Sequence, residues 1–310
     1  MMPLWQNGLR AASAVASRLS WPALAWRGGS EAAGPVTPSD HTLPPGPPPG
    51  PPPDAARADW ADRLWQEGYA LPGGEAEVQR LAGLLPLSPA TTLLLLGHDA
   101  GGAAGCIARR SGAWVAAHQC DPLLAGRMEA RLRPLGRRVA VQPWDPAAPQ
   151  FRARYHHHAL ALEPLRAGAD PARLLTAMAA ALKPGAQLVL LDLVAAAAPP
   201  DAGRPDRAMR RWMQLEARAA PPPDQAALEA ALAAAGFHLH VAEDVGPRHC
   251  AAALEAWARL IGGLRGPGRP PSNAAAAGLI AEAEAWLLRQ RLLGNGALRL
   301  FRWHASLAAT

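Results

Sequence analysis

From about residue 92 to the end of the chain, short apolar runs alternate with longer segments in which apolar residues recur every three or four positions. The short runs predict strands, and their lack of polar interruption is typical of parallel strands covered on both faces. Strands are expected at residues 92–96, 114–118, 139–142, 158–162, 187–193, 237–241 and 297–305. Because strands that alternate with helices need right-handed crossovers, the pattern predicts a largely parallel α/β sheet.

Two helices carry clear end signals. Over residues 170–182, Asp170 is the expected N-cap and Pro171 occupies the first helical position. Asp224 is expected to cap a second helix, which runs to Gly236. Two shorter helices, near residues 59–65 and 78–85, flank a loop and precede the first strand, where they can fold over a ligand.

Two long helices are predicted between the last two strands, over residues 247–264 and 272–293. Their apolar residues recur at helical spacing and are expected to point toward the core. These residues are Cys250, Leu254, Trp257 and Ile261 in the first helix and Leu279, Ile280, Ala283 and Leu287 in the second.

The composition of the chain changes near residue 58. Residues 1–58 are expected to form a disordered, proline-rich extension, and residues 59–310 one globular domain. Residues 44–53, PPGPPPGPPP, cannot form helix or sheet and predict a polyproline II spacer of roughly 30 Å. Residues 1–27 carry arginines, no acid, and apolar residues at helical spacing, so they can lie on a membrane surface or act as a targeting sequence; the alternative is an unstructured start.

Composition narrows the class of protein. The 310 residues are 50% apolar, which is enough for one enzyme-sized domain with an extension. The formal charge of +6 comes from arginine, since Lys183 is the only lysine. The arginines are scattered along the sequence without interleaved aromatic residues, so nucleic acid is not expected as a partner.

Cysteines and histidines give no sign of a disulfide framework or a metal site. The three cysteines are far apart, odd in number and without a CxxC pair, which predicts a reducing, cytoplasmic location. Of the histidines at 156–158, at most His156 and His158 share one face of a strand, so no metal is expected. No apolar stretch reaches the roughly 20 residues that a membrane span needs.

Three phrases in this order of elements carry a family resemblance: LLLLGHDAGG at 93–102, ALKPGAQLVLLD at 181–192 and LAAAGFHLHVAED at 232–244. Over residues 59–305 the chain resembles the class I S-adenosylmethionine-dependent methyltransferases. The resemblance implies a Rossmann-like, doubly wound, mostly parallel seven-stranded sheet with a C-terminal antiparallel strand pair and extra helices between strands six and seven. It also implies S-adenosylmethionine as cofactor and a small-molecule methyl acceptor, covered by the early helices, the arginine-bearing segment 204–212 and the two late helices.

The resemblance places the cofactor's methionine part at the glycine-rich turn. Gly97, Gly101 and Gly102 match the family, and glycines there let backbone N–H groups approach the ligand. Asp99 stands where the family has its second turn glycine. A carboxylate there adds bulk and negative charge beside the expected cofactor carboxylate, unless it turns outward or binds the ammonium group.

Four further residues fall on cofactor positions of the family. Gln119 stands where an acid normally accepts the ribose hydroxyls, and the lost charge assistance is worth about 1–2 kcal/mol. Asp121 is either a substitute acceptor or the N-cap of the next helix. Trp144 and Asp145 match a position that reaches the adenine amino group; the alternative for Asp145 is a loop aspartate before Pro146.

The resemblance leaves one candidate for catalysis and two functions. Glu163 is the ionisable residue at the family position after the fourth strand, where it is either a general base for methyl transfer or a loop acid. The first function is methyl transfer to a small molecule. The second is a catalytically degenerate fold kept as a binding or assembly module, since Asp99 and Gln119 depart from the family together. A nicotinamide dehydrogenase is disfavoured because the G-x-G-x-x-G pattern and its acid are missing.

Overall fold

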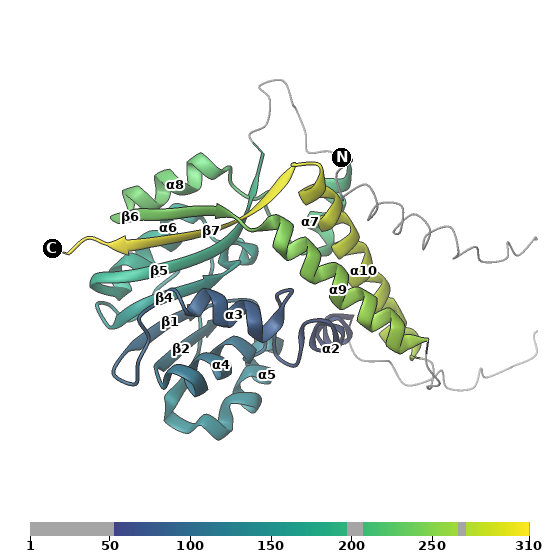
Figure 1. The fold of residues 1–310 in the computed structure, drawn as a ribbon, viewed down its shortest axis with the longest axis horizontal. Coiled ribbons are helices and arrows are strands. Elements are labelled where there is room, and N and C mark those ends of the chain that lie inside the picture. The colour runs from purple at the N-terminus through teal and green to yellow at the C-terminus, as the bar shows by residue number, and fades with distance from the viewer. Residues whose placement is uncertain (1–52, 197–206, 266–270, 310) are drawn as a thin grey trace, which may run out of the picture. The chain divides into compact units, whose positions relative to one another are not determined.

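The computed structural model describes residues 53–196, 207–265 and 271–309 (Figure 1). Contacts divide the chain after Pro48, and the described residues all fall in the second unit. Most of the expected N-terminal extension, including residues 1–27 and 44–52, therefore lies outside the described residues. Helix α2 spans Pro53–Trp65, so residues 53–58, expected in the extension, are helical.

Seven strands form one sheet in the order β3-β2-β1-β4-β5-β7-β6. Strand β7 lies between β5 and β6 and is antiparallel to both, whereas the other pairings are parallel. The strands are β1 (Thr92–Leu96), β2 (Trp114–Gln119), β3 (Val139–Pro143), β4 (His156–Leu162), β5 (Leu182–Ala195), β6 (Phe237–Asp244) and β7 (Leu298–Leu307). The predicted doubly wound α/β fold is confirmed and each expected strand is present, although β5 begins five residues before its expected start and β6 ends three residues beyond its expected end.

Helices cover both faces of this sheet (Figure 1). They are α3 (Gly74–Ala82), α4 (Gly102–Ser111), α5 (Pro122–Leu132), α6 (Pro171–Ala181), α7 (Arg207–Leu215), α8 (Gln225–Ala234), α9 (Gly246–Leu264) and α10 (Asn273–Gly294), with 3-10 turns η1 (Arg133–Arg138) and η2 (Pro164–Ala167). Asp170 and Asp224 accept backbone N–H groups at the starts of α6 and α8, as their positions in the sequence predicted. Alternate residues of β1 enter two cores, Leu93 and Leu95 on one face and Leu94 and Leu96 on the other.

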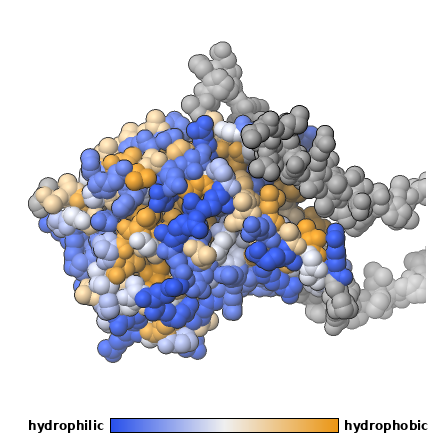
Figure 2. Space-filling model, viewed as in Figure 1, coloured by the Kyte–Doolittle hydropathy of each residue, from blue (hydrophilic) through white to orange (hydrophobic). Residues whose placement is uncertain are grey.

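The predicted inward faces of α9 and α10 are wrong at their largest aliphatic residues. Leu254 is 58% exposed, Ile280 66% and Leu287 68%, and Figure 2 shows apolar side chains on the surface over these helices. The buried stripe of α10 instead contains Ala285, Trp286, Leu292 and two charged residues, Glu282 and Arg289. Hydropathy spacing misassigned the faces because small and ion-paired residues occupy the interior.

Within the described ranges, no helix is both long and apolar enough to cross a membrane.

Several histidines are buried in this fold. His156 opens β4, is 1% exposed, and its two ring nitrogens have no hydrogen-bond partner within the described residues. Burial lowers the pKa of His156 to about 4, since the charged form would lose its hydration. The unfolded chain therefore takes up this proton first as the pH falls. The associated stability is present above the ordinary histidine pKa of about 6.5 and is lost between about pH 6.5 and 4.

Replacing this imidazole should make the protein less sensitive to acid. Between pH 6 and 5, the free energy of unfolding of the wild type should fall by about 1 kcal/mol more than that of His156→Leu. The variant loses less because it lacks the proton uptake by this imidazole on unfolding. Urea unfolding at both pH values measures the slope. His238→Leu, at an exposed position of β6, is the matched control for a histidine-to-leucine change. An unchanged slope in His156→Leu would contradict the assignment.

Candidate functional site

The candidate site begins at the turn between β1 and α4. Gly101 is the N-cap of α4 and has φ of 100°, a left-handed conformation that favours glycine. Asp99, two residues earlier, is buried and points inward. Its carboxylate accepts the N–H of Gly101 and the N–H of Ala103, each at an N···O distance of 3.0 Å. The Asp99 carboxylate thus occupies the N-terminus of α4, where an external carboxylate would otherwise bind.

The protonation of Asp99 reflects this position. Burial raises the pKa of its carboxyl to about 6, although the N–H groups of Gly101 and Ala103 and the nearby Arg131 favour the charged form. Near neutral pH the carboxylate is ionised, and it adds negative charge to the turn.

Gln119 lies at the end of β2, and both polar atoms of its side-chain amide form hydrogen bonds with backbone groups. Its Nε2 donates to the carbonyl of Asp99 at 2.9 Å and to that of Gly97 at 3.4 Å, and its Oε1 accepts the N–H of Asp121 at 3.0 Å. Asp121 itself is the N-cap of α5, because Oδ1 accepts the N–H groups of Leu123 and Leu124. Of the two roles considered for Asp121, the geometry shows the cap.

A loop from the N-terminal side covers the same turn. The carbonyl oxygen of Gly68 accepts the N–H of Ala100 at 3.0 Å and the N–H of Gly102 at 2.9 Å. The ring of Tyr69 lies so close to Gly102 that a Cβ there would be 2.7 Å from Tyr69 Cδ2. The N–H groups of residues 100–103 therefore all bond to acceptors from the chain itself.

Glu163, directly after β4, forms a buried ion pair. Its carboxylate accepts two hydrogen bonds from Arg289 of α10, at 2.9 and 2.5 Å, and lies 3.8 Å from Arg218. Burial alone would raise the pKa of Glu163, but Arg289 outweighs it and holds the pKa well below the usual range. A carboxylate in this state stays ionised and is a weak proton acceptor.

More charged groups surround this pair, and the motifs in the sequence did not indicate them. Asp192 in β5 accepts the N–H groups of Leu165 and Leu193, and burial raises its pKa to about 7. Arg166 of η2 lies 3.1 Å from Glu216. An acid that ends the apolar run LVLLD was a usable signal for Asp192. Arg289 carried no such signal, since its partner lies 126 positions away.

The two remaining candidates lie after β3. Trp144 is buried, and its ring is 6.2 Å from the ring of Phe151. Asp145 is exposed and its carboxylate accepts the N–H of Ala147 at 2.9 Å, as a loop aspartate does. The adenine-binding role of these two residues stays a prediction.

The carboxyl ends of β1 and β4 meet at one small pocket, which brings Asp99 and Glu163 together. The loop and α3 close one side with Tyr69, Ala70, Leu71 and Val78, and the sheet side contributes His98, Asp99, Leu162, Glu163 and Arg166. The enclosed space holds about one water molecule. In this arrangement the residues do not fit S-adenosylmethionine, because the turn N–H groups, the Gln119 amide and the space above Gly102 are already occupied.

No metal centre accompanies the pocket. Across residues 53–196, 207–265 and 271–309, no group of three or more His, Cys, Asp or Glu side chains is arranged to hold a metal ion.

Solved structures that match this fold include methyltransferases and a cyclase. Phosphoethanolamine N-methyltransferase 2 of Haemonchus contortus, in complex with S-adenosyl-L-methionine, matches with a TM-score of 0.71 at 16% identity, over 83% of this chain and 57% of that chain. This chain thus spans little more than half of that enzyme. Geranyl diphosphate C-methyltransferase from Streptomyces coelicolor A3(2) matches with a TM-score of 0.56 at 17% identity, over 74% of this chain and 76% of that one.

A third match is the [4+2]-cyclase SpnF, with a TM-score of 0.57 at 19% identity, over 76% of this chain and 81% of that one. The fold is therefore that of the class I S-adenosylmethionine-dependent methyltransferases, with their mostly parallel seven-stranded sheet. No family model and no curated protein sequence matches the chain.

Breaking the buried pair from one side should be costly. Glu163→Gln leaves the Arg289 guanidinium buried without its bidentate partner, and the free energy of unfolding should fall by about 3–5 kcal/mol. Urea unfolding at pH 7 measures the change. Glu284→Gln breaks the exposed pair with Arg211 and should cost less than about 1 kcal/mol; equal losses in the two variants would show that the Glu163 pair has no special weight.

Proposed function

We propose that this chain is a catalytically degenerate member of the methyltransferase fold, one that works as a binding or assembly module and does not use S-adenosylmethionine. The observation that carries the proposal is the Asp99 carboxylate, which accepts the N–H groups of Gly101 and Ala103 at the start of α4. A cofactor carboxylate at this helix end would meet an ionised side chain in place of free donors.

A second contact supports the same conclusion. Gln119 replaces an acid, and its amide ties the ends of β1 and β2 together through Gly97, Asp99 and Asp121. Through these hydrogen bonds, both residues that depart from the family pattern, Asp99 and Gln119, stabilise the structure. The Asp99 carboxylate accepts two N–H groups at the start of α4, and Gln119 holds the backbone of Asp99 in place. Two changes that stabilise each other are what we expect where a ligand site has become a structural element.

The fold itself leaves the function open. One structure that matches this chain is named a [4+2]-cyclase, whereas two others are named methyltransferases. Function is decided by the residues of the site, and the same fold supports different chemistry.

Methyl transfer to a small-molecule acceptor is the second candidate. The retained glycines Gly97, Gly101 and Gly102 favour it, as does the likeness to an enzyme solved with S-adenosyl-L-methionine. This function requires the loop at Gly68 to leave the turn and Asp99 to turn away. Asp121, Trp144 and Asp145 would then be further cofactor contacts, and Glu163 the candidate base, although its pairing with Arg289 opposes that role.

Calorimetry with S-adenosylhomocysteine separates the two functions without knowledge of the substrate. The wild-type chain should show no binding at millimolar ligand. Asp99→Gly with Gln119→Glu frees the two helix N–H groups and restores the ribose acceptor, so this double variant should bind with a dissociation constant below about 1 mM, which is a standard binding free energy of about −4 kcal/mol or more favourable.

The single variants give the control for this experiment. Asp99→Gly alone should lose about 1 kcal/mol of stability with the two hydrogen bonds at the start of α4, and Gln119→Glu alone should place a second carboxylate near Asp99. Neither single variant should therefore bind as well as the double variant. Micromolar binding by the wild type would overturn the degenerate function and favour methyl transfer.

A further inference from the structure

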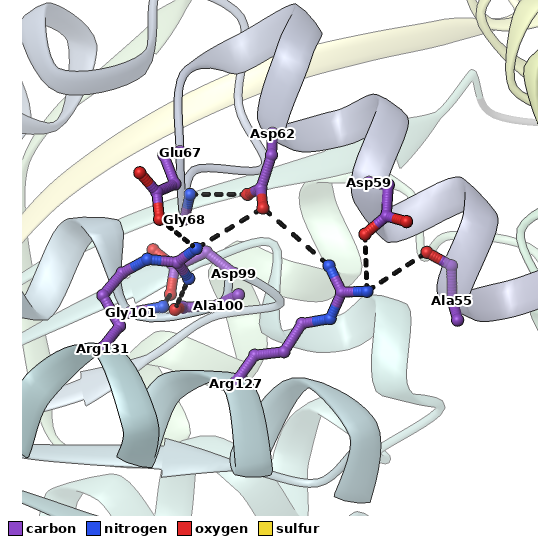
Figure 3. A network of polar contacts seen from close by, with 10 residues as sticks. All are labelled: Ala55, Asp59, Asp62, Glu67, Gly68, Asp99, Ala100, Gly101, Arg127 and Arg131. Carbon is purple, nitrogen blue, oxygen red and sulfur yellow. Dashed lines mark hydrogen bonds and ion pairs between the residues drawn. The ribbon is translucent and has the colours of Figure 1, made fainter.

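Two arginines of α5 reach across to the N-terminal part of the domain (Figure 3). Arg127 and Arg131 are four positions apart and so lie on one face of the helix. Arg127 Nη2 donates to the Asp59 carboxylate at 2.7 Å and to the carbonyl of Ala55 at 3.2 Å. Arg131 Nη2 donates to the Glu67 carboxylate at 3.1 Å. The arginines thereby connect α5 to α2 and to the loop that follows it.

Asp62 joins both arginines to this loop. Its Oδ2 lies 3.4 Å from Arg131 and 3.8 Å from Arg127, while its Oδ1 accepts the N–H of Gly68 at 2.6 Å. One carboxylate thus holds the backbone of Gly68 on one side and both guanidinium groups on the other, as Figure 3 shows.

Gly68 in turn forms hydrogen bonds with the glycine-rich turn. Its carbonyl accepts the N–H groups of Ala100 and Gly102, and the Arg131 side chain runs beneath it to donate to the Ala100 carbonyl. A Cβ on Gly68 would lie 2.8 Å from the Gly102 nitrogen and 3.0 Å from Arg131 Cδ. Only glycine fits here, because φ of 87° and this close approach both exclude a side chain.

Helix α2 has a second anchor that does not involve the arginines. Trp60 Nε1 donates to the Ala275 carbonyl of α10 at 2.7 Å, and the ring of Trp65 lies 4.6 Å from that of Trp286. Loss of the arginine contacts would therefore leave α2 in place and release the segment between α2 and α3.

We propose that residues 66–73, the latch loop, form a salt-sensitive latch that closes the glycine-rich turn and is held shut by Arg127 and Arg131. The ion pairs are partly open to solvent, with side chains of Arg131 and Asp62 22% and 24% exposed and that of Glu67 81% exposed, so salt weakens them. When the latch opens, the N–H groups of Ala100 and Gly102 become available to a ligand or partner. The latch goes beyond the proposed function and holds whether or not the turn binds a cofactor.

The turn contains its own control for this proposal. Ala100 and Gly102 donate to the latch loop, whereas the alternating Gly101 and Ala103 donate to the Asp99 carboxylate within the turn. Opening of the latch should expose the first pair and leave the second pair protected. Residue-resolved amide hydrogen exchange on the full chain reads all four positions at once.

The charge variant keeps the aliphatic bulk beneath Gly68. In Arg127→Met with Arg131→Met, exchange at Ala100 and Gly102 should rise by about tenfold or more, with less than about a twofold change at Gly101 and Ala103. The wild type should shift the same way when NaCl is raised from about 0.05 to 0.5 M. Arg211→Met removes an exposed ion pair with Glu284 and is the matched control, with no change expected at any of the four amides.

A second variant opens the latch without altering any charge. Gly68→Ala places a Cβ against the Gly102 nitrogen and should give the same split between the two pairs of amides, independent of salt. If the arginine variants do not fold, Gly68→Ala and the salt titration of the wild type carry the test. Equal acceleration at all four amides, or none at Ala100 and Gly102, would overturn the latch.

Discussion

The start of α4 imposes the constraint on which the rest of the site depends. A helix leaves its first N–H groups without partners inside the helix, and a buried helix end must find acceptors for them. Here Asp99 and the carbonyl of Gly68 supply those acceptors. The position of the loop after α2 follows from this need, as do the contacts of Gln119 and the arginines of α5. Because these N–H groups already have acceptors within the chain, they are not free to bind an external anion.

The ion pair of Glu163 and Arg289 has a corresponding role on the neighbouring strand. It ties the end of β4 to α10, and its desolvation is offset by two hydrogen bonds and by the nearby Arg218. Glu163 and Asp99 thus place two ionised carboxylates along the sheet side of one small pocket. Ligands of this fold usually bind at the carboxyl edge of the sheet. Here that edge carries many charged side chains, and most of them pair with other groups of the same chain.

The sequence predicted the fold well where the signal is local. Strand β1 has its expected bounds, and the caps Asp170 and Asp224 begin helices because a side-chain oxygen at that position bonds the next free N–H groups. The faces of α9 and α10 were misassigned. Helix α10 packs against α2 and α7, and α9 packs against α2, so segments from elsewhere in the chain decide which positions are buried. The interior accepts a charged residue such as Arg289 because Glu163 lies beside it.

For the site, the sequence by itself determined which residues stand at the turn, including the departures Asp99 and Gln119. It left open whether Asp99 points outward or inward and whether Asp121 accepts a ligand or caps a helix. Only the tertiary structure decided these points, because the acceptor that completes the turn is Gly68 and the cations that hold it are Arg127 and Arg131. Hydrogen bonds and ion pairs between distant segments follow from the packing of helices, and no local pattern of residues encodes them.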